Sequence, residues 1–182
     1  MYLRRIRLKH PIFHLLSNSA FKFIMDNGFL FKLKETQTVY KESQPARANI
    51  YFVLYGQYEF SCSVIKKTER TPNAPKFGEI MGIGWTIGEE ILYGPIDLPT
   101  EVPSPKTSND QIRRHETCHS INESCLLQLS VEDLVTMSSQ KAAVGGGGML
   151  VKDYEVLLSF LEKNFDVKNA WRKEQGLVPD DD

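Results

Sequence analysis

The chain has 182 residues and a mass of 20.8 kDa, which is the size of one domain with additions rather than two domains. Hydrophobic residues make up 41% of it and charged residues 25%, which is enough apolar surface to build a core, and wholesale disorder is excluded. Its 22 basic and 23 acidic residues give a net charge of −1. Because binding to a phosphate backbone needs a basic excess, we expect no nucleic-acid partner.

The chain carries no signal for membrane insertion or secretion. No apolar run approaches the roughly 18–20 residues that span a bilayer, so we expect no membrane partner and a cytoplasmic location. The basic residues Arg4, Arg5, Arg7 and Lys9 precede the first acid, Asp26, which leaves mitochondrial targeting as an alternative. The three cysteines form no Cys-x-x-Cys pair, a pattern that favours reduced thiols over a disulfide framework.

The N-terminal segment, residues 1–28, is predicted to be helical. Apolar residues recur at steps of three and four over 12–24, and the polar residues 17–19 allow a break between two short helices. From Phe29 the apolar period changes to two, and β-branched and aromatic residues follow as far as Tyr40. This change predicts a strand that enters a sheet.

The middle of the chain is predicted to be a series of antiparallel strands. The apolar run 50–55 indicates a buried strand, and the alternating segment 58–65 is expected to pair with it. A polar loop over 66–76 leads to a short strand over 77–83. Residues 84–93 then predict a turn that runs into one helical turn.

A long irregular loop is predicted over 94–112, which holds four of the nine prolines. Residues 115–120 and 125–129 are expected to form another strand pair, which completes a β-roll over 29–130. A helix then begins at Val131, for which Ser130 is a suitable N-cap.

Two C-terminal helices are predicted within 131–175, ahead of an acidic tail over 176–182. The glycines 145–148 are expected to form a hinge between these helices, because glycine costs about 1 kcal/mol relative to alanine inside a helix. The last helix has an apolar stripe: Leu150, Tyr154, Leu157, Leu158, Leu161 and Phe165.

Several short motifs follow one another in a recognisable order. They are 11–13 with 16–17, 50–54 with Gly56, Gly84 with 87–89, Arg114 with Thr117, and 125–129. In this order they resemble the cyclic nucleotide-binding domain, the module of cAMP-dependent protein kinase regulatory subunits, cyclic-nucleotide-gated channels and bacterial CRP-type regulators. The resemblance covers roughly residues 8–165. It implies a mainly β fold, an antiparallel jelly-roll β-barrel with short N-terminal helices and C-terminal helices.

The resemblance also implies a ligand and the residues that bind it. Gly88 and Glu89 would hold the ribose of cAMP or cGMP, and Arg114 the cyclic phosphate, with Arg113 as the alternative. Free N–H groups at a helix start and an arginine both attract a phosphate. The remaining implied contacts are the backbone N–H groups of Glu90, Ile91 and His115, and a cap on the base from Leu157, Phe160 or Leu161.

Three departures from the family pattern weaken this implication. Glu89 and Arg114 lie 25 positions apart, so the proline-rich loop is an insertion inside the phosphate-binding segment. Glu90 stands where the family usually has an apolar residue, and His115 and Glu116 replace small residues. We therefore expect three acids, Glu89, Glu90 and Glu116, to gather where an anion should bind.

The residues favour no metal site and no catalytic site. His115, Cys118 and His119 are close in sequence, but alternation along a strand places Cys118 on the face opposite the two histidines. Two ligands do not complete a zinc site, and a nucleophilic cysteine would need an adjacent histidine. Cys125 opens an apolar strand and is expected in the core. We expect no enzyme, no metal and no cofactor beyond a nucleotide ligand.

Two functional hypotheses remain. The first is a regulatory module that senses cAMP or cGMP and transmits the event to a protein partner through its C-terminal helix. The second is a degenerate member of the fold that binds no nucleotide and acts as a structural or scaffolding subunit. The insertion and the extra acids favour the second hypothesis, and the motif order favours the first.

Overall fold

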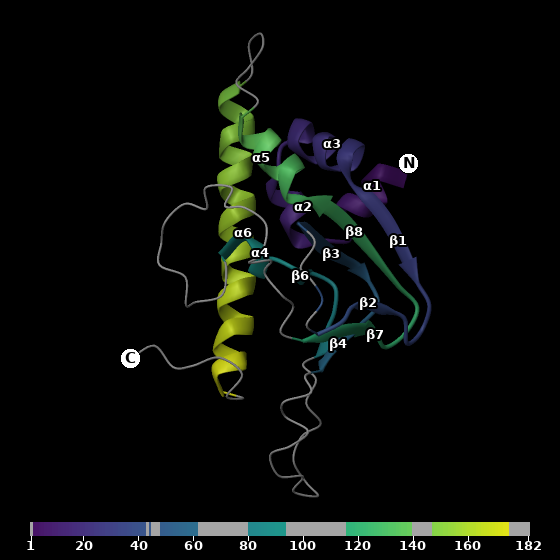
Figure 1. Cartoon of the computed structure of the whole chain (residues 1–182). Helices are drawn as coiled ribbons and strands as arrows, with labels where there is room; N and C mark the ends of the chain where they lie inside the picture. The colour runs from purple at the N-terminus through teal and green to yellow at the C-terminus, as the bar shows by residue number, and fades with distance from the viewer. Residues whose placement is uncertain are drawn as a thin grey trace, which may run out of the picture.

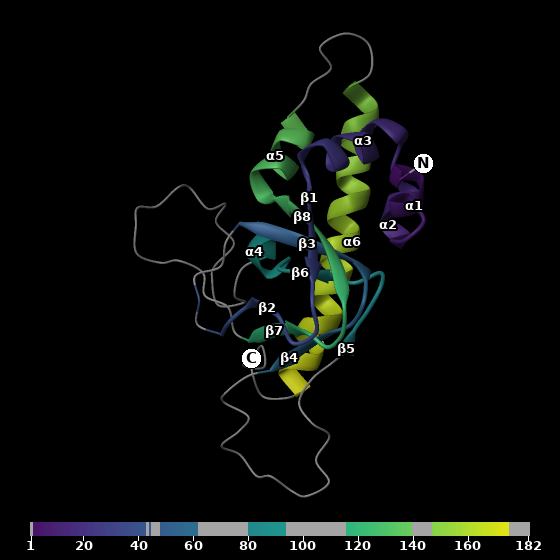
Figure 2. The same cartoon turned by 90° about the vertical axis from the view of Figure 1, so that its right-hand side faces the viewer.

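The computed structural model describes residues 2–42, 44, 48–61, 80–93, 116–139 and 147–174. Within these ranges, short N-terminal helices lead into antiparallel strands, and two further helices follow (Figure 1). The long helix α6 (Gly147–Glu174) runs along one side of the structure in Figure 1 and down its middle in Figure 2. Figure 2 shows α5 (Val131–Ser139) on one side of its upper half and the N-terminal helices on the other.

The N-terminal segment folds into three short helices, α1 (Tyr2–Arg7), α2 (Pro11–Leu15) and α3 (Asn18–Asn27). The predicted break between two helices is confirmed. Ser17 caps α3, because its hydroxyl accepts a hydrogen bond from the N–H of Ala20 at 3.2 Å.

The strands divide between two four-stranded antiparallel sheets, and the predicted jelly roll is confirmed. One sheet has the order β1-β8-β3-β6 and the other the order β2-β7-β4-β5. The first sheet is formed by β1 (Phe29–Leu33), β8 (Ser124–Ser130), β3 (Asn49–Tyr55) and β6 (Thr86–Ile87). The second is formed by β2 (Thr38–Tyr40), β7 (Thr117–Ser120), β4 (Tyr58–Ser61) and β5 (Ile80–Met81).

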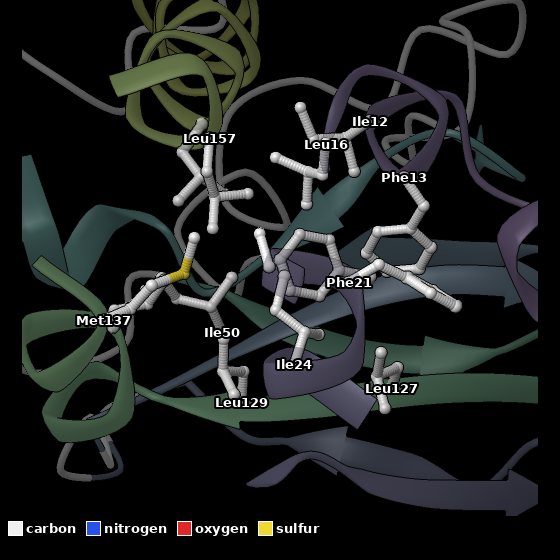
Figure 3. Packing of buried hydrophobic residues seen from close by; sticks show 14 of the residues in the cluster. Ile12, Phe13, Leu16, Phe21, Ile24, Ile50, Leu127, Leu129, Met137 and Leu157 are labelled. Atoms are coloured by element: carbon white, nitrogen blue, oxygen red, sulfur yellow. The ribbon is translucent and has the colours of Figure 1, made fainter. Parts of the chain in front are cut away.

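The helices cover the outer face of the first sheet. Alternate residues of β3 and β8 point toward them, which places Ile50, Leu127 and Leu129 in one apolar cluster with helix residues. Figure 3 shows Ile50 and Leu129 beside Met137 of α5, with Leu157 of α6 above them and Leu127 further along the sheet, beyond Ile24. The helices α2 and α3 add further labelled side chains from above the sheet: Ile12, Phe13, Phe21 and Ile24.

A second apolar cluster fills the space between the two sheets. It contains Val53 and Leu126 from the first sheet and Tyr58, Phe60 and Cys118 from the second, all buried. Strands β3 and β8 thus bury both of their faces. This explains why 50–55 and 125–129 read as nearly continuous apolar runs in the sequence.

Two predicted strand pairs are wrong. Strand β3 pairs with β6 and β8, and β4 pairs with β5 and β7, so 50–55 and 58–65 do not form a hairpin within the described residues. Strands β7 and β8 likewise lie in different sheets. At Gly56, where φ is +90° and a Cβ would lie 2.3 Å from the Cβ of Ser124, the chain passes from the first sheet to the second.

The C-terminal helices confirm one prediction and correct another. Ser130 caps α5 as expected, because its hydroxyl accepts a hydrogen bond from the N–H of Asp133 at 3.0 Å. The predicted glycine hinge over 145–148 is wrong in its second half, since α6 begins at Gly147. Glycine is tolerated in the first turn of a helix, where the backbone N–H groups make no internal bonds.

Candidate functional site

The segment expected to bind a ligand is a turn between β6 and the short helix α4 (Glu90–Tyr93). Gly88 has a φ of +93°, a conformation that favours glycine. The N–H of Leu92 donates to the carbonyl of Glu89 at 2.9 Å, and the N–H of Ile91 donates to that of Gly88 at 3.3 Å. These bonds close the turn, and the Glu89 side chain is completely buried.

Helix α6 supplies the partner of Glu89. The ammonium of Lys168 forms an ion pair with Glu89 Oε1, and both side chains are at most 2% exposed. The same ammonium donates to the carbonyl of Thr86 at 3.0 Å and lies 5.9 Å from the centre of the Phe60 ring. Burial raises the pKa of Glu89, and the nearby Lys168 opposes this rise.

One turn further along α6, Arg172 pairs with Glu116. Its Nε donates to Glu116 Oε2 at 3.1 Å and its Nη2 donates to Oε1, so the guanidinium contacts both carboxylate oxygens. The hydroxyl of Tyr40 lies 3.5 Å from the same Oε1. Burial lowers the pKa of the Arg172 guanidinium, but Glu116, together with Glu90 and Tyr40, raises this pKa overall.

The three acids expected from the sequence gather at this place. Glu89, Glu90 and Glu116 are all buried, and Glu90 interacts electrostatically with both Glu89 and Arg172. The site is therefore formed by three carboxylates of the β-roll facing two cations of α6.

The structure describes some of the residues expected to contact a ligand and not others. Gly88, Glu89, Glu90 and Ile91 come together in the turn, and Ile91 is half-buried. The expected phosphate ligands, Arg114 or Arg113, lie outside the described residues, and so does His115. Their roles stay predictions.

The three base-capping candidates lie on the part of α6 that packs against the helices. Leu157 and Leu161 are completely buried in the apolar cluster on the helix side of the first sheet. Phe160 is half-buried, and its ring lies 5.4 Å from that of His10 in a T-shaped contact. The contacts of these side chains are thus with the core, and the capping role stays a prediction.

The residues that the sequence analysis missed are Lys168 and Arg172. A signal for them exists in the sequence. The buried positions of α6 recur at steps of three and four, and this stripe runs on through both cations: Asp153, Leu157, Leu161, Asn164, Lys168 and Arg172. A lysine or arginine that continues a buried stripe needs an acid opposite it, because these residues are almost never fully buried unpaired.

A further contact ties the turn to α6. The hydroxyl of Tyr93, the last residue of α4, donates to the carbonyl of Leu158 at 3.0 Å. Its ring also lies 5.2 Å from the ring of Phe165. The end of the Gly88–Tyr93 segment is therefore in direct contact with α6, and α4 lies beside that helix (Figure 1).

The structure describes Cys118, Cys125 and His119, which were considered above as ligands or nucleophiles. Cys118 is buried between the sheets, and His119, on the opposite face of β7, contacts Glu59 at 3.0 Å. Burial raises the pKa of the Cys125 thiol. Among the described residues, no three metal-ligating side chains come together, and no helix there is long and apolar enough to cross a membrane.

Comparisons with known proteins agree on the fold. No protein-family model and no curated protein sequence matches the chain. A cyclic nucleotide-binding domain from Methylobacillus flagellatus superimposes with a TM-score of 0.60 at 15% identity, over 99% of this chain and 86% of that one. The sensor domain of the transcriptional regulator DNR from Pseudomonas aeruginosa gives 0.54 at 13% identity, over 98% and 94%.

A third similar structure is a putative cyclic nucleotide-binding protein from Geobacter metallireducens, with a TM-score of 0.52 at 16% identity, over 88% of this chain and 98% of that one. In these three comparisons the superposition covers 86–99% of each chain. The chain therefore has the fold of the cyclic nucleotide-binding domains, as the motif order predicted.

Proposed function

We propose that the chain is a regulatory module of the cyclic nucleotide-binding fold that acts on a protein partner through α6 and needs no nucleotide to hold that helix in place. The observation that carries this proposal is the buried ion pair between Lys168 and Glu89. Glu89 is the acid that the family resemblance assigns to the ribose, and here it is already neutralised by the chain itself. The module is proposed to have no enzymatic activity.

The energetics favour the ion pair over a ribose. A nucleotide that used Glu89 would have to displace Lys168 and leave its ammonium buried without its acid, which costs about 3–5 kcal/mol. A hydrogen bond from a ribose hydroxyl to a carboxylate returns only about 1.5–3 kcal/mol. The two acids beside Glu89 add repulsion toward a phosphate. Nucleotide affinity should thus be weakened by roughly a hundredfold or more.

Isothermal titration calorimetry with cAMP and with cGMP tests the proposal. We expect no saturable heat from the wild-type chain up to millimolar nucleotide. The variant Lys163→Met, which changes an exposed lysine of the same helix, should behave identically. Saturable binding of either nucleotide at micromolar concentration would show that the module depends on a nucleotide and would overturn the proposal.

A nucleotide sensor is the second candidate, and the Gly88–Tyr93 turn favours it. The left-handed glycine before a buried acid and the contact from Tyr93 to α6 are what a sensor would need to couple ligand to helix. In that case a nucleotide competes with Lys168 for Glu89. Binding to the wild type that is lost in Arg114→Ala and kept in Arg113→Ala would support this candidate and identify the phosphate ligand.

A further inference from the structure

We infer that the interior of this β-roll is a binding site for cations, with one subsite for an ammonium group and one for a guanidinium group, both occupied by α6. The inference rests on the proposed function, because it concerns the same site and names the ligand class that the site accepts. The family resemblance predicts an anion at this place. In this chain the same place receives a lysine and an arginine side chain from one face of α6.

The ammonium subsite consists of the Glu89 carboxylate, the Thr86 carbonyl and the face of the Phe60 ring. Each of these groups attracts a compact cation. The Lys168 ammonium forms an ion pair with Glu89, donates a hydrogen bond of 3.0 Å to the Thr86 carbonyl and lies 5.9 Å from the centre of the Phe60 ring. The three groups come from β6, the turn after it, and β4. The subsite is thus a property of the β-roll rather than of one loop.

The guanidinium subsite consists of the Glu116 carboxylate with the Tyr40 hydroxyl beside it. Glu116 accepts hydrogen bonds from two different nitrogens of Arg172, the paired geometry that a planar guanidinium makes with a carboxylate. Both side chains are at most 6% exposed. An ammonium on the same backbone position has no second nitrogen to contact the other oxygen.

The two subsites are spaced to suit one helix face. Lys168 and Arg172 are four residues apart on α6, so they lie on the same side of the helix, about 6 Å apart along its axis. The charge balance also selects cations. The three buried acids outnumber the two cations among the described residues of the site, so the acids leave no excess positive charge for a phosphate.

Chemical rescue of vacated subsites tests the inference on the full chain. Lys168→Ala removes the equivalent of n-propylammonium, and Arg172→Ala removes the equivalent of N-ethylguanidinium. We expect each cation to raise the melting temperature of its own variant by about 3–6 °C at a concentration about tenfold above its dissociation constant. Each should stabilise the other variant less. If Lys168→Ala does not fold, the same titration is followed as recovery of the folded fraction by circular dichroism.

Three controls decide the result. The uncharged 1-propanol should not rescue Lys168→Ala, and n-propylammonium should not stabilise the wild type or the exposed-site variant Lys163→Ala. Equal effects of propanol and propylammonium, or stabilisation of Lys168→Ala by cAMP but not by propylammonium, would overturn the inference. A wild type that binds nucleotide while Lys168→Ala is rescued by propylammonium would overturn the proposed function and leave the cation subsites standing.

Discussion

The carboxylate of Asp153 on α6 accepts two hydrogen bonds from Ser17, one from its backbone N–H at 2.8 Å and one from its hydroxyl at 2.5 Å. Ser17 is also the N-cap of α3, so a single residue begins one helix and fastens another. Asp153 is 6% exposed. Its carboxylate lies at the N-terminus of α3, where the positive end of that helix's dipole favours an acid. Polar contacts therefore hold both halves of α6: Asp153 in its N-terminal half, and Lys168 and Arg172 in its C-terminal half.

Ser17→Ala should lower the free energy of unfolding by about 2 kcal/mol, because it removes the helix cap and one hydrogen bond to a carboxylate. Urea unfolding measures the change. The matched control is Ser19→Ala, an exposed serine of the same helix, which should change the free energy by less than about 0.5 kcal/mol. Equal effects of the two variants would contradict a structural role for the Ser17–Asp153 contact.

Lys168→Met should lower the free energy of unfolding by about 3–5 kcal/mol, because it leaves the buried Glu89 without its cation. The double variant Glu89→Gln/Lys168→Met removes both charges and should recover most of the loss. Urea unfolding of the wild type, the two single variants and the double variant gives the coupling between the residues. A double variant no more stable than Lys168→Met would show that the two side chains do not act as a pair.

The free energy of unfolding of Lys168→Met should increase as the pH falls toward 4.5. Burial raises the pKa of Glu89, and without Lys168 nothing of comparable strength opposes this rise. An acid whose pKa is raised on folding takes up a proton in the folded state, so stability increases as the pH falls from the folded pKa toward 4.5. Urea midpoints measured across this range should show the increase in Lys168→Met. Its absence from Glu89→Gln/Lys168→Met would assign the increase to Glu89.

Arg172→Lys should not be a conservative change. A lysine at this position contacts one oxygen of Glu116 and not both, and the loss of one charged hydrogen bond costs about 1.5–3 kcal/mol. Thermal or urea unfolding measures it. Arg5→Lys, at an exposed position of α1, is the control and should leave stability within about 0.5 kcal/mol of the wild type. A neutral Arg172→Lys would argue against the paired geometry.

His10 should make the chain less stable in mild acid. Its ring is buried among Phe13, Phe52 and Phe160, and burial lowers its pKa from 6.5 to about 4, although the bond to the Trp85 carbonyl opposes this. The unfolded chain therefore binds the extra proton first, and stability falls by about 3 kcal/mol as the pH drops from 6.5 to 4.

Urea unfolding at several pH values checks this expectation. In His10→Phe the part of the decrease that arises from His10 should disappear, whereas His14→Phe, at an exposed position of the same region, should keep the wild-type pH dependence. An unchanged pH dependence in His10→Phe would show that another group is responsible.

Local signals in the sequence were enough to predict most helices and strands. The change of apolar period at Phe29, the break between helices at 17–19, the N-cap Ser130 and the short helix after Gly88 all lie where the structure has them. These features depend on residues within a few positions of one another. The short strand β6 was missed, because two residues are too few to show a period.

The pairing of strands could not be predicted in the same way. Residues 50–55 and 58–65 read as a hairpin, but their partners come from distant parts of the chain: β3 pairs with β6 and β8, and β4 pairs with β5 and β7. The candidate site could likewise be predicted only in part, because some of its residues are distant in sequence. Glu89, Glu90 and Glu116 were predicted to gather, but their cations lie on a helix more than 50 residues further along the chain.

The stripe of buried residues on α6 constrains how that helix can move. Leu157 and Lys168 are 11 residues apart, close to three full turns, so they share one face. A slip of α6 by a single residue would rotate this face by about 100°, expose the leucines and remove Lys168 from its acid. Any intermediate position of α6 would therefore lose both the apolar burial around Leu157 and the ion pair of Lys168. A signal carried by this helix should therefore be all-or-none, with α6 either docked along its whole length or released.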